Sequence, residues 1–184
     1  MFKRHLVLAM KTKKPLVLHI RGLNAADAAM KIMEHIGLPQ DWPMHMHAFT
    51  DSWSECEAWS EKWTGMKFGV LSDFFDHKIA ENLPIDKIIL ETDAPYFLPA
   101  KIRTTSTTRP TLPGDIWFVA QQVAYWKNMT VEEVLQENRK NITDLYGIPP
   151  YSPYPAAKMA ETPEEIAQDD WIHTCNGMFQ VCHL

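Results

Sequence analysis

The chain has 184 residues, of which 46% are hydrophobic and 11% are aromatic, and its formal net charge is −5 at pH 7. These values are typical of one globular domain, alone or followed by a tail, and the acidic balance argues against a general electrostatic grip on nucleic acid. No apolar run approaches the length of a membrane span, so we expect no membrane-embedded segment.

Four short apolar runs predict the buried strands of a parallel sheet. They follow one another at the repeat length of strand–helix units, which is typical of the α/β fold class. Their nearly continuous apolar character suits strands that helices cover on both faces. The four runs are Pro15–Ile20, Met44–Phe49, Lys67–Leu71 and Lys87–Glu91.

Helical patterns fill the segments between and after these strands. Asn24, Ser52 and Thr130 stand where N-cap residues are expected, and the last two have capping-box spacing with a glutamate. Other helices are predicted over residues 1–10, 79–83 and 115–127, and a loop over residues 97–113.

One helical stripe carries Cys56, Trp59 and Trp63. A row of aromatic rings can form a ligand platform, but at helical spacing it more often packs against a sheet. We therefore predict that this stripe lies in the core.

The composition changes after the last predicted helix, where prolines and tyrosines replace the periodic apolar pattern. The sequence therefore predicts one domain over residues 1–148. It also predicts a Pro/Tyr-rich C-terminal tail over residues 149–184 that is extended or disordered. One short helix is predicted to begin at Thr162 within this tail.

The fourth predicted strand ends in two acids, Glu91 and Asp93, before Pro95 stops the strand. Burying a carboxylate without a partner is costly, so the end of a buried strand is an unusual place for two of them. A metal ion is one partner that explains the pair.

Other candidate ligands stand near the carboxyl ends of earlier predicted strands. His19 and Arg21 follow the first strand, and His45 and His47 share one face of the second. Ligand groups of parallel barrels and open sheets gather at this edge. Two imidazoles converging there with the Asp93 carboxylate predict a divalent-cation site.

Each of these side chains also has a purely structural interpretation. A lone histidine such as His19 or His45 in an apolar run is often a hydrogen-bonded core residue. Arg21 can form a surface ion pair, and Glu91 and Asp93 can brace the loop that follows them. The residues alone leave both interpretations open.

Several segments together resemble the TatD family of metal-dependent deoxyribonucleases. Pro84–Tyr96 resembles the family signature, and Lys14–Arg21 matches its histidine–arginine motif. His47–Ser52 matches a third motif less fully, and Asn141 and Tyr146 match the closing helix. These motifs occur in the family's order and correspond to roughly the second half of a family member.

The resemblance implies a parallel (β/α) barrel of the TIM type, present here as four βα units with C-terminal helices and an irregular tail. It also implies hydrolysis of phosphodiesters, with DNA as substrate and one or two divalent ions (Mg²⁺, Mn²⁺ or Zn²⁺) as cofactors. By position, His19, His47 and Asp93 correspond to metal ligands, and Asp93 also to the catalytic group that orients or deprotonates the attacking water. Arg21 corresponds to a weaker candidate for contacting the substrate phosphate.

The chain departs from the family pattern in ways that bear on activity. Family members begin with His-x-His on their first strand and supply a bridging glutamate from the fourth, and this chain starts after both. Gly22 stands where the family has an acid, and Asp51 where it has a glycine. Half a barrel also leaves two open sheet edges. We therefore expect weak metal binding, weak or absent cleavage, and self-association or a partner that covers the edges.

Two other functions stay open: a non-catalytic truncated barrel that acts as a binding or oligomerising module, and an amidohydrolase-type enzyme acting on a small ester or amide. The three cysteines Cys56, Cys175 and Cys182 form no Cys-x-x-Cys pair and suggest no disulfide framework. We therefore expect an intracellular location, cytoplasmic or nuclear.

Overall fold

The computed structural model describes residues 1–22, 24–103, 109–148 and 179–181. Its centre is a parallel five-stranded sheet with the strand order β4-β3-β2-β1-β5. The first four strands fall within or next to the four predicted runs, so the predicted α/β class and parallel sheet are confirmed. The strands are β1 (Leu16–Leu18), β2 (Met44–Met46), β3 (Met66–Leu71), β4 (Ile88–Glu91) and β5 (Phe179–Val181).

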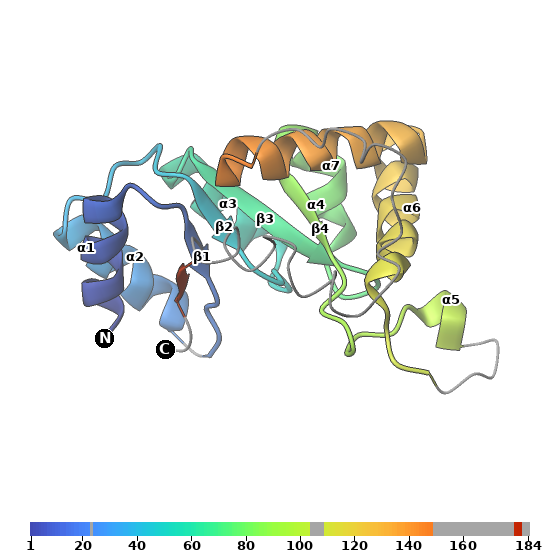
Figure 1. Ribbon diagram of the computed structural model, residues 1–184, viewed down its shortest axis with the longest axis horizontal. Coiled ribbons are helices and arrows are strands. Elements are labelled where there is room, and N and C mark those ends of the chain that lie inside the picture. The colour runs from blue at the N-terminus through green and yellow to red at the C-terminus, as the bar shows by residue number, and fades with distance from the viewer. Residues whose placement is uncertain (23, 104–108, 149–178, 182–184) are drawn as a thin grey trace, which may run out of the picture.

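Helices connect the strands and cover the sheet, as Figure 1 shows. Every helix that was predicted within residues 1–148 is present, and the described part of the predicted loop over residues 97–113 contains one more, the short α5. The helices are α1 (Phe2–Thr12), α2 (Ala25–His35), α3 (Trp53–Lys62), α4 (His77–Asn82), α5 (Ala100–Arg103), α6 (Ile116–Lys127) and α7 (Val131–Tyr146). Two 3₁₀ turns, η1 (Ile85–Lys87) and η2 (Pro113–Asp115), precede β4 and α6.

The predicted N-caps differ in how they work. At α7, Glu133 Oε2 accepts a hydrogen bond from Thr130 N at 2.8 Å, and Thr130 Oγ1 accepts one from Glu133 N at 3.2 Å. At α3, Glu55 Oε2 accepts from Ser52 N at 3.1 Å. Asn24 does precede α2, but its side chain makes no capping bond, because the residue adopts a left-handed turn with φ 63°. Asparagine tolerates that conformation better than most residues.

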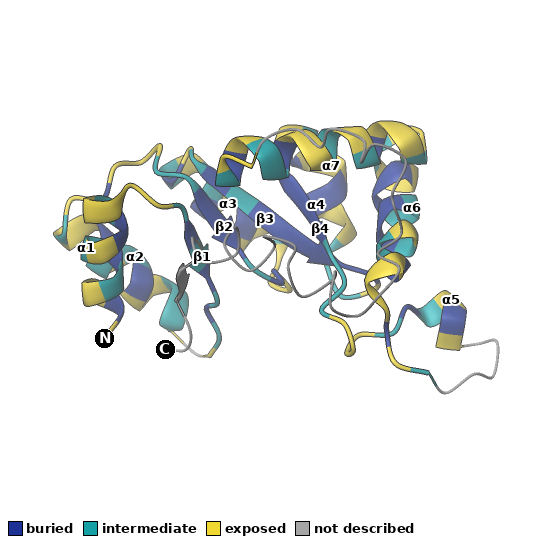
Figure 2. Cartoon of the chain, in the orientation of Figure 1, coloured by how far each residue is buried: buried dark blue, intermediate teal, exposed yellow. Residues whose placement is uncertain are grey.

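The core lies between the sheet and the helices, and Figure 2 colours most of the central strands as buried. Trp59 and Trp63 are each 2% exposed and Cys56 is fully buried. The tryptophan stripe of α3 therefore packs in the core, as the sequence predicted.

The two ends of the sheet differ from the two open edges that the sequence predicted. β5 pairs with β1 in parallel, with Leu16 opposite Phe179, so β1 is not an open edge and β5 is the outer strand at this end. At the other end of the sheet, two side chains of α7 bind the backbone of β4. Asn138 Oδ1 accepts from Leu90 N at 2.9 Å, and Asn141 Nδ2 donates to Ile88 O at 2.8 Å. Residues two apart on a strand direct their backbone groups to the same side, so both amides bind the side of β4 away from β3.

The predicted tail falls outside the described residues except for residues 179–181, and so does the helix predicted at Thr162. The division into a domain over residues 1–148 and a tail therefore stays a prediction. Among the helices that the structure describes, none has the length and apolar character needed to cross a membrane.

Candidate metal centre

Three side chains from β2 and β4 meet at the carboxyl edge of the sheet. His47 Nδ1 lies 2.6 Å from Glu91 Oε1, and His45 Nε2 lies 3.1 Å from the same oxygen. The other carboxylate oxygen, Glu91 Oε2, accepts a hydrogen bond from Ala48 N at 2.6 Å. The Glu91 carboxylate thus joins two strands that are not neighbours, since β3 lies between them.

A glycine on the intervening strand makes this contact possible. A Cβ atom at Gly69 would lie 1.9 Å from Glu91 Oε2 and 2.8 Å from His45 Nε2. Both distances are far below van der Waals contact, so any side chain at position 69 would displace the carboxylate. A glycine inside a strand often marks such a close approach.

Asp93 completes the cluster from the loop after β4. Its Oδ2 lies 3.6 Å from His47 Nε2, on the side of the ring opposite to Glu91. Asp93 has a left-handed backbone with φ 48°, which a non-glycine residue rarely adopts outside turns and functional sites. One potential ligand atom from each of His47, Glu91 and Asp93 lies within 4.8 Å of the others, and all three residues are half-buried. Such a group is within reach of both a cation and solvent.

His19 lies beside this cluster, at the end of β1. Its ring centroid is 5.2 Å from that of His47, in an edge-to-face arrangement. The structure thus brings together the three residues that the sequence suggested as ligands, His19, His47 and Asp93. It also places Glu91 in the cluster. From the sequence alone, Glu91 could either bind a metal ion or brace the loop that follows it.

His45 belongs to β2, and it has a different place from His47, which directly follows that strand. It is 6% exposed, and its Nδ1 lies 2.7 Å from the hydroxyl oxygen of Tyr146 at the end of α7. Burial raises the pKa of Tyr146, so the hydroxyl stays protonated and donates to His45 Nδ1. His45 Nε2 then carries the proton that faces Glu91, and His45 supports the carboxylate from behind.

Arg21 binds backbone carbonyl groups at the ends of β1 and β2. It donates to Ile20 O at 2.8 Å and also to Ala48 O, with a longer contact to His47 O at 3.5 Å. Its positive charge therefore stands next to the cluster, and its side chain holds the two strand ends together. Contact with a substrate phosphate remains a prediction for this residue.

The charges of the cluster favour a cation. Burial would raise the pKa of Glu91, but the neighbouring imidazoles of His45 and His47 outweigh it and lower the pKa to about 2. The hydrogen bond that His47 donates to Glu91 raises the pKa of His47, and burial raises that of Asp93. Glu91 is thus a fixed negative charge, while His47 and Asp93 hold protons more readily than usual. A divalent ion would supply the positive charge that these protons supply in its absence.

The donor set fits a divalent metal. Imidazole nitrogen with carboxylate oxygen suits Zn²⁺ and Mn²⁺, and carboxylates also suit Mg²⁺. The second ring nitrogen of His47 is bonded to Glu91, an arrangement that commonly orients a metal-bound histidine. The residues present therefore fit a metal site, and they do not select one metal.

Two residues of this site could not be assigned from the sequence. Gly69 interrupts an apolar strand, which is the usual signal of a close approach, but the approaching group lies 22 positions away and is known only from the fold. Tyr146 matched a family motif, and only the packing of α7 shows that its hydroxyl meets His45.

The comparisons with known proteins agree with this geometry. The family model of TatD related DNase matches residues 1–147. The human protein named 3'-5' RNA nuclease TATDN2 is 31% identical over 153 residues, which are 80% of this chain and 20% of that protein. The 3'-5' ssDNA/RNA exonuclease TatD of Pantoea vagans is 32% identical over 152 residues, 79% of this chain and 56% of that one.

Solved structures show the same fold. YJJV, a TatD homolog from Escherichia coli K12, superposes with a TM-score of 0.63 at 22% identity, over 78% of this chain and 54% of that one. The TatD structures that this chain resembles are TIM barrels, so its parallel sheet corresponds to part of such a barrel. The chain spans about half the length of the bacterial relatives that it matches. The match over residues 1–147 and the shared fold show that this chain belongs to the TatD-related deoxyribonuclease family.

Proposed function

We propose that this chain carries the metal centre of a divalent-metal-dependent nuclease that removes nucleotides from the 3′ end of single-stranded DNA or RNA. The observation that supports this most strongly is the cluster of His47, Glu91 and Asp93, whose ligand atoms lie within 4.8 Å of one another at the carboxyl edge of a parallel sheet. The substrate class and the polarity are those in the names of the relatives.

The proposed roles follow from the contacts of each residue. A divalent ion bound here would lower the pKa of a coordinated water and stabilise the charge that develops on the phosphate. His47 and Asp93 would hold that ion, with His19 beside them. Glu91 fixes the His47 ring through the 2.6 Å bond to Nδ1. Asp93 has a raised pKa, so its carboxylate is a suitable acceptor for the proton of the attacking water.

The test is cleavage of a single-stranded oligonucleotide labelled at its 5′ end, with Mg²⁺, Mn²⁺ or Zn²⁺ and with a chelator. We expect a ladder of products shortened stepwise from the 3′ end, abolished by the chelator. Asp93→Asn and His47→Ala should each reduce the rate by about 100-fold or more, as expected when a metal ligand is removed.

Asp41→Asn is the matched control, because Asp41 is an exposed carboxylate before β2, at the opposite end of the sheet. It should cleave like wild type. Cleavage that resists the chelator, or that survives both ligand substitutions, would contradict the proposed centre.

We further expect slow turnover from this chain alone. The candidate cluster offers His47, Glu91 and Asp93 with His19 beside them, and the resemblance to the family implies further ligands that are not among these residues. A smaller ligand set holds a metal less firmly. Fast, metal-dependent cleavage by the purified chain would contradict this expectation. The absence of any metal binding in calorimetry would instead favour a non-catalytic binding module.

A further inference from the structure

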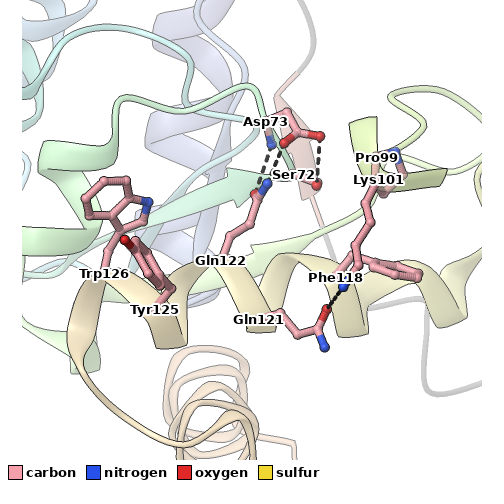
Figure 3. Close-up of a pocket in the computed structure, with 9 residues that line it drawn as sticks. All are labelled: Ser72, Asp73, Pro99, Lys101, Phe118, Gln121, Gln122, Tyr125 and Trp126. Atoms are coloured by element: carbon pink, nitrogen blue, oxygen red, sulfur yellow. Dashed lines mark hydrogen bonds between the residues drawn. The ribbon is translucent and has the colours of Figure 1, made fainter. Parts of the chain in front are cut away.

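A cavity of about 210 Å³ opens between α6 and the segments that follow β3 and β4. Figure 3 shows its two walls. One wall is the face of α6 that carries Phe118, Gln122, Tyr125 and Trp126, and the other is formed by Asp73 and the start of α5. None of the proposed metal ligands lines this cavity.

Flat aromatic surface makes up much of the α6 wall. Trp126 is 39% exposed, and its ring stacks on His77 with centroids 4.7 Å apart. Tyr125 is 76% exposed and meets Trp126 edge-to-face at 4.9 Å. Two neighbouring rings that are held in place yet open to solvent form a surface on which another planar ring can stack.

Fixed polar groups stand opposite these rings. Asp73 accepts hydrogen bonds from Gln122 Nε2 and Ala100 N, each at 2.5 Å, and its own N–H donates to Gln122 Oε1 at 3.0 Å. The amide and the carboxylate therefore hold each other in one orientation. Carboxylate and amide groups recognise the amino and carbonyl edges of nucleobases.

One cation stands at the rim. Lys101 Nζ lies 5.9 Å from the centre of the Phe118 ring and 3.5 Å from Gln121 Oε1. A phosphate would meet an ammonium group here, while a base would meet rings and amides. The cavity is smaller than the ~300–1,000 Å³ of ordinary ligand pockets, so it suits one base better than a whole nucleotide.

The cavity and the metal centre share one edge of the sheet. Leu71, the last residue of β3, pairs with Glu91, the last residue of β4, so Ser72 and Asp73 leave the sheet beside the segment that leads to Asp93. The chain from Asp93 leads directly to Ala100, whose amide binds Asp73. A single strand of nucleic acid bound at the proposed metal centre would therefore pass close to the cavity.

We propose that this cavity binds one unpaired base of the single-stranded nucleic acid whose 3′ end lies at the metal centre. The base stacks on the exposed rings of Tyr125 and Trp126, and Lys101 meets the adjoining phosphate. The proposal rests on the proposed nuclease function, since it assigns a second contact to the same substrate.

The proposed base site is tested by measuring binding under conditions that prevent cleavage. The full chain is titrated, with a chelator present, against a fluorescent single-stranded oligothymidylate, and affinity is read from fluorescence anisotropy. Tyr125→Ala should raise Kd by about fivefold or more, as expected for the loss of one base–aromatic stack. Tyr125→Phe, which keeps the ring, should bind like wild type. Lys101→Ala should weaken binding and flatten its dependence on salt by about one phosphate contact.

Trp117→Ala is the matched control, because Trp117 is a 42% exposed aromatic residue of the same helix that does not line the cavity. A single abasic residue moved along the oligonucleotide gives a second, independent readout. When it replaces the base that occupies the cavity, the abasic residue should weaken binding to wild type as much as Tyr125→Ala weakens binding to the intact oligonucleotide. Combining the abasic residue at that position with Tyr125→Ala should weaken binding no further.

The outcomes separate this proposal from the proposed nuclease function. No binding by wild type, equal loss in Trp117→Ala and Tyr125→Ala, or unchanged binding in Tyr125→Ala would overturn the base site. If the wild-type chain cleaves from the 3′ end while Tyr125→Ala binds normally, the base site fails and the nuclease function stands. If Tyr125→Ala weakens binding but no cleavage occurs with any metal, the base site stands and the nuclease function fails.

Discussion

Glu91 is the residue on which the arrangement of the metal centre depends. Its carboxylate bonds His47 and the backbone of Ala48, which directly follow β2, two strands away. It reaches them only because Gly69 has no side chain on the strand between. The orientation of the His47 ring therefore depends on a side-chain contact from β4 that crosses β3. The backbone pairing of the strands does not set it.

The first prediction concerns Gly69→Ala. The added methyl group would overlap Glu91 Oε2, so the carboxylate must move away from His47 and Ala48. We expect metal affinity, measured by calorimetry with Mn²⁺ or Zn²⁺, to fall by about 10- to 100-fold, the usual cost of losing a group that orients a ligand.

Gly114→Ala is the control, since a Cβ at Gly114 meets nothing within 4 Å. It should bind metal like wild type. Equal affinity in Gly69→Ala and wild type would show that the position of Glu91 does not matter for metal binding.

Among the elements, α7 connects the edge of the sheet to the metal centre. Asn141 is 1% exposed, and its Nδ2 donates to Ile85 O and Ile88 O, both at 2.8 Å. Five residues later, Tyr146 supports His45. The helix thus binds the outer side of β4 through residues in its middle and supports His45 from its C-terminal end.

We predict that Asn141→Ala destabilises the fold, because it leaves buried carbonyl groups of η1 and β4 without a donor. The expected loss is about 1–3 kcal/mol in the free energy of unfolding, measured by urea denaturation. Lys140→Ala removes the exposed neighbouring side chain and should change stability by less than about 0.5 kcal/mol. Similar stabilities for the two variants would contradict this role for Asn141.

The start of α6 supplies a prediction on pH. Asp115 is buried and accepts hydrogen bonds from both terminal nitrogens of Arg109, at 2.7 and 2.8 Å. This pairing, opposed by burial and aided by Leu112 N, lowers the pKa of Asp115. A lowered pKa in the folded state adds stability above the unfolded value of about 3.9, and the gain is lost as pH falls through the folded value.

Asp115→Asn should therefore melt at a lower temperature than wild type at pH 7. The difference should shrink as pH falls below about 4, because the wild-type carboxyl group then gains a proton and loses its ion pair. Melting curves of both proteins across this range check the sign. A difference that stays constant down to pH 3 would show that the ion pair does not stabilise the fold.

At the scale of the whole molecule, the contacts of the end strands determine which backbone groups of this partial barrel stay unpaired. An unpaired strand edge invites association with another chain. Here β5, formed by residues 179–181, pairs with β1, and two side-chain amides of α7 bind the outer side of β4. Residues of the chain itself thus pair with β1 and bind the outer side of β4, and β5 becomes the outer strand at the other end of the sheet.

Removing residues 149–184 would uncover the edge of β1. We expect the shortened chain to self-associate at concentrations where the full chain does not, as measured by light scattering. Adding the tail back as a separate peptide should reverse the association. If both forms have the same mass in solution, β5 does not protect this edge.

Much of the fold and part of the site follow from local patterns in the sequence. The four apolar runs predicted β1 to β4, since a buried parallel strand needs apolar residues on both faces. His47 and Asp93 were identifiable because polar residues are costly at the ends of buried strands unless they have partners. The capping residues Ser52 and Thr130 marked their helices because the signal lies within three residues.

The remainder depends on contacts between residues far apart in the chain. The sequence did not show that Gly69 makes room for Glu91, that Tyr146 supports His45, or that β5 pairs with β1, because each contact joins separate elements. Local periodicity specifies which face of an element is buried, but not which residue it will meet there. Composition and spacing therefore indicated the type of fold and the kind of ligand that we propose, and the packing of β3, β4 and α7 determined the geometry of the candidate site.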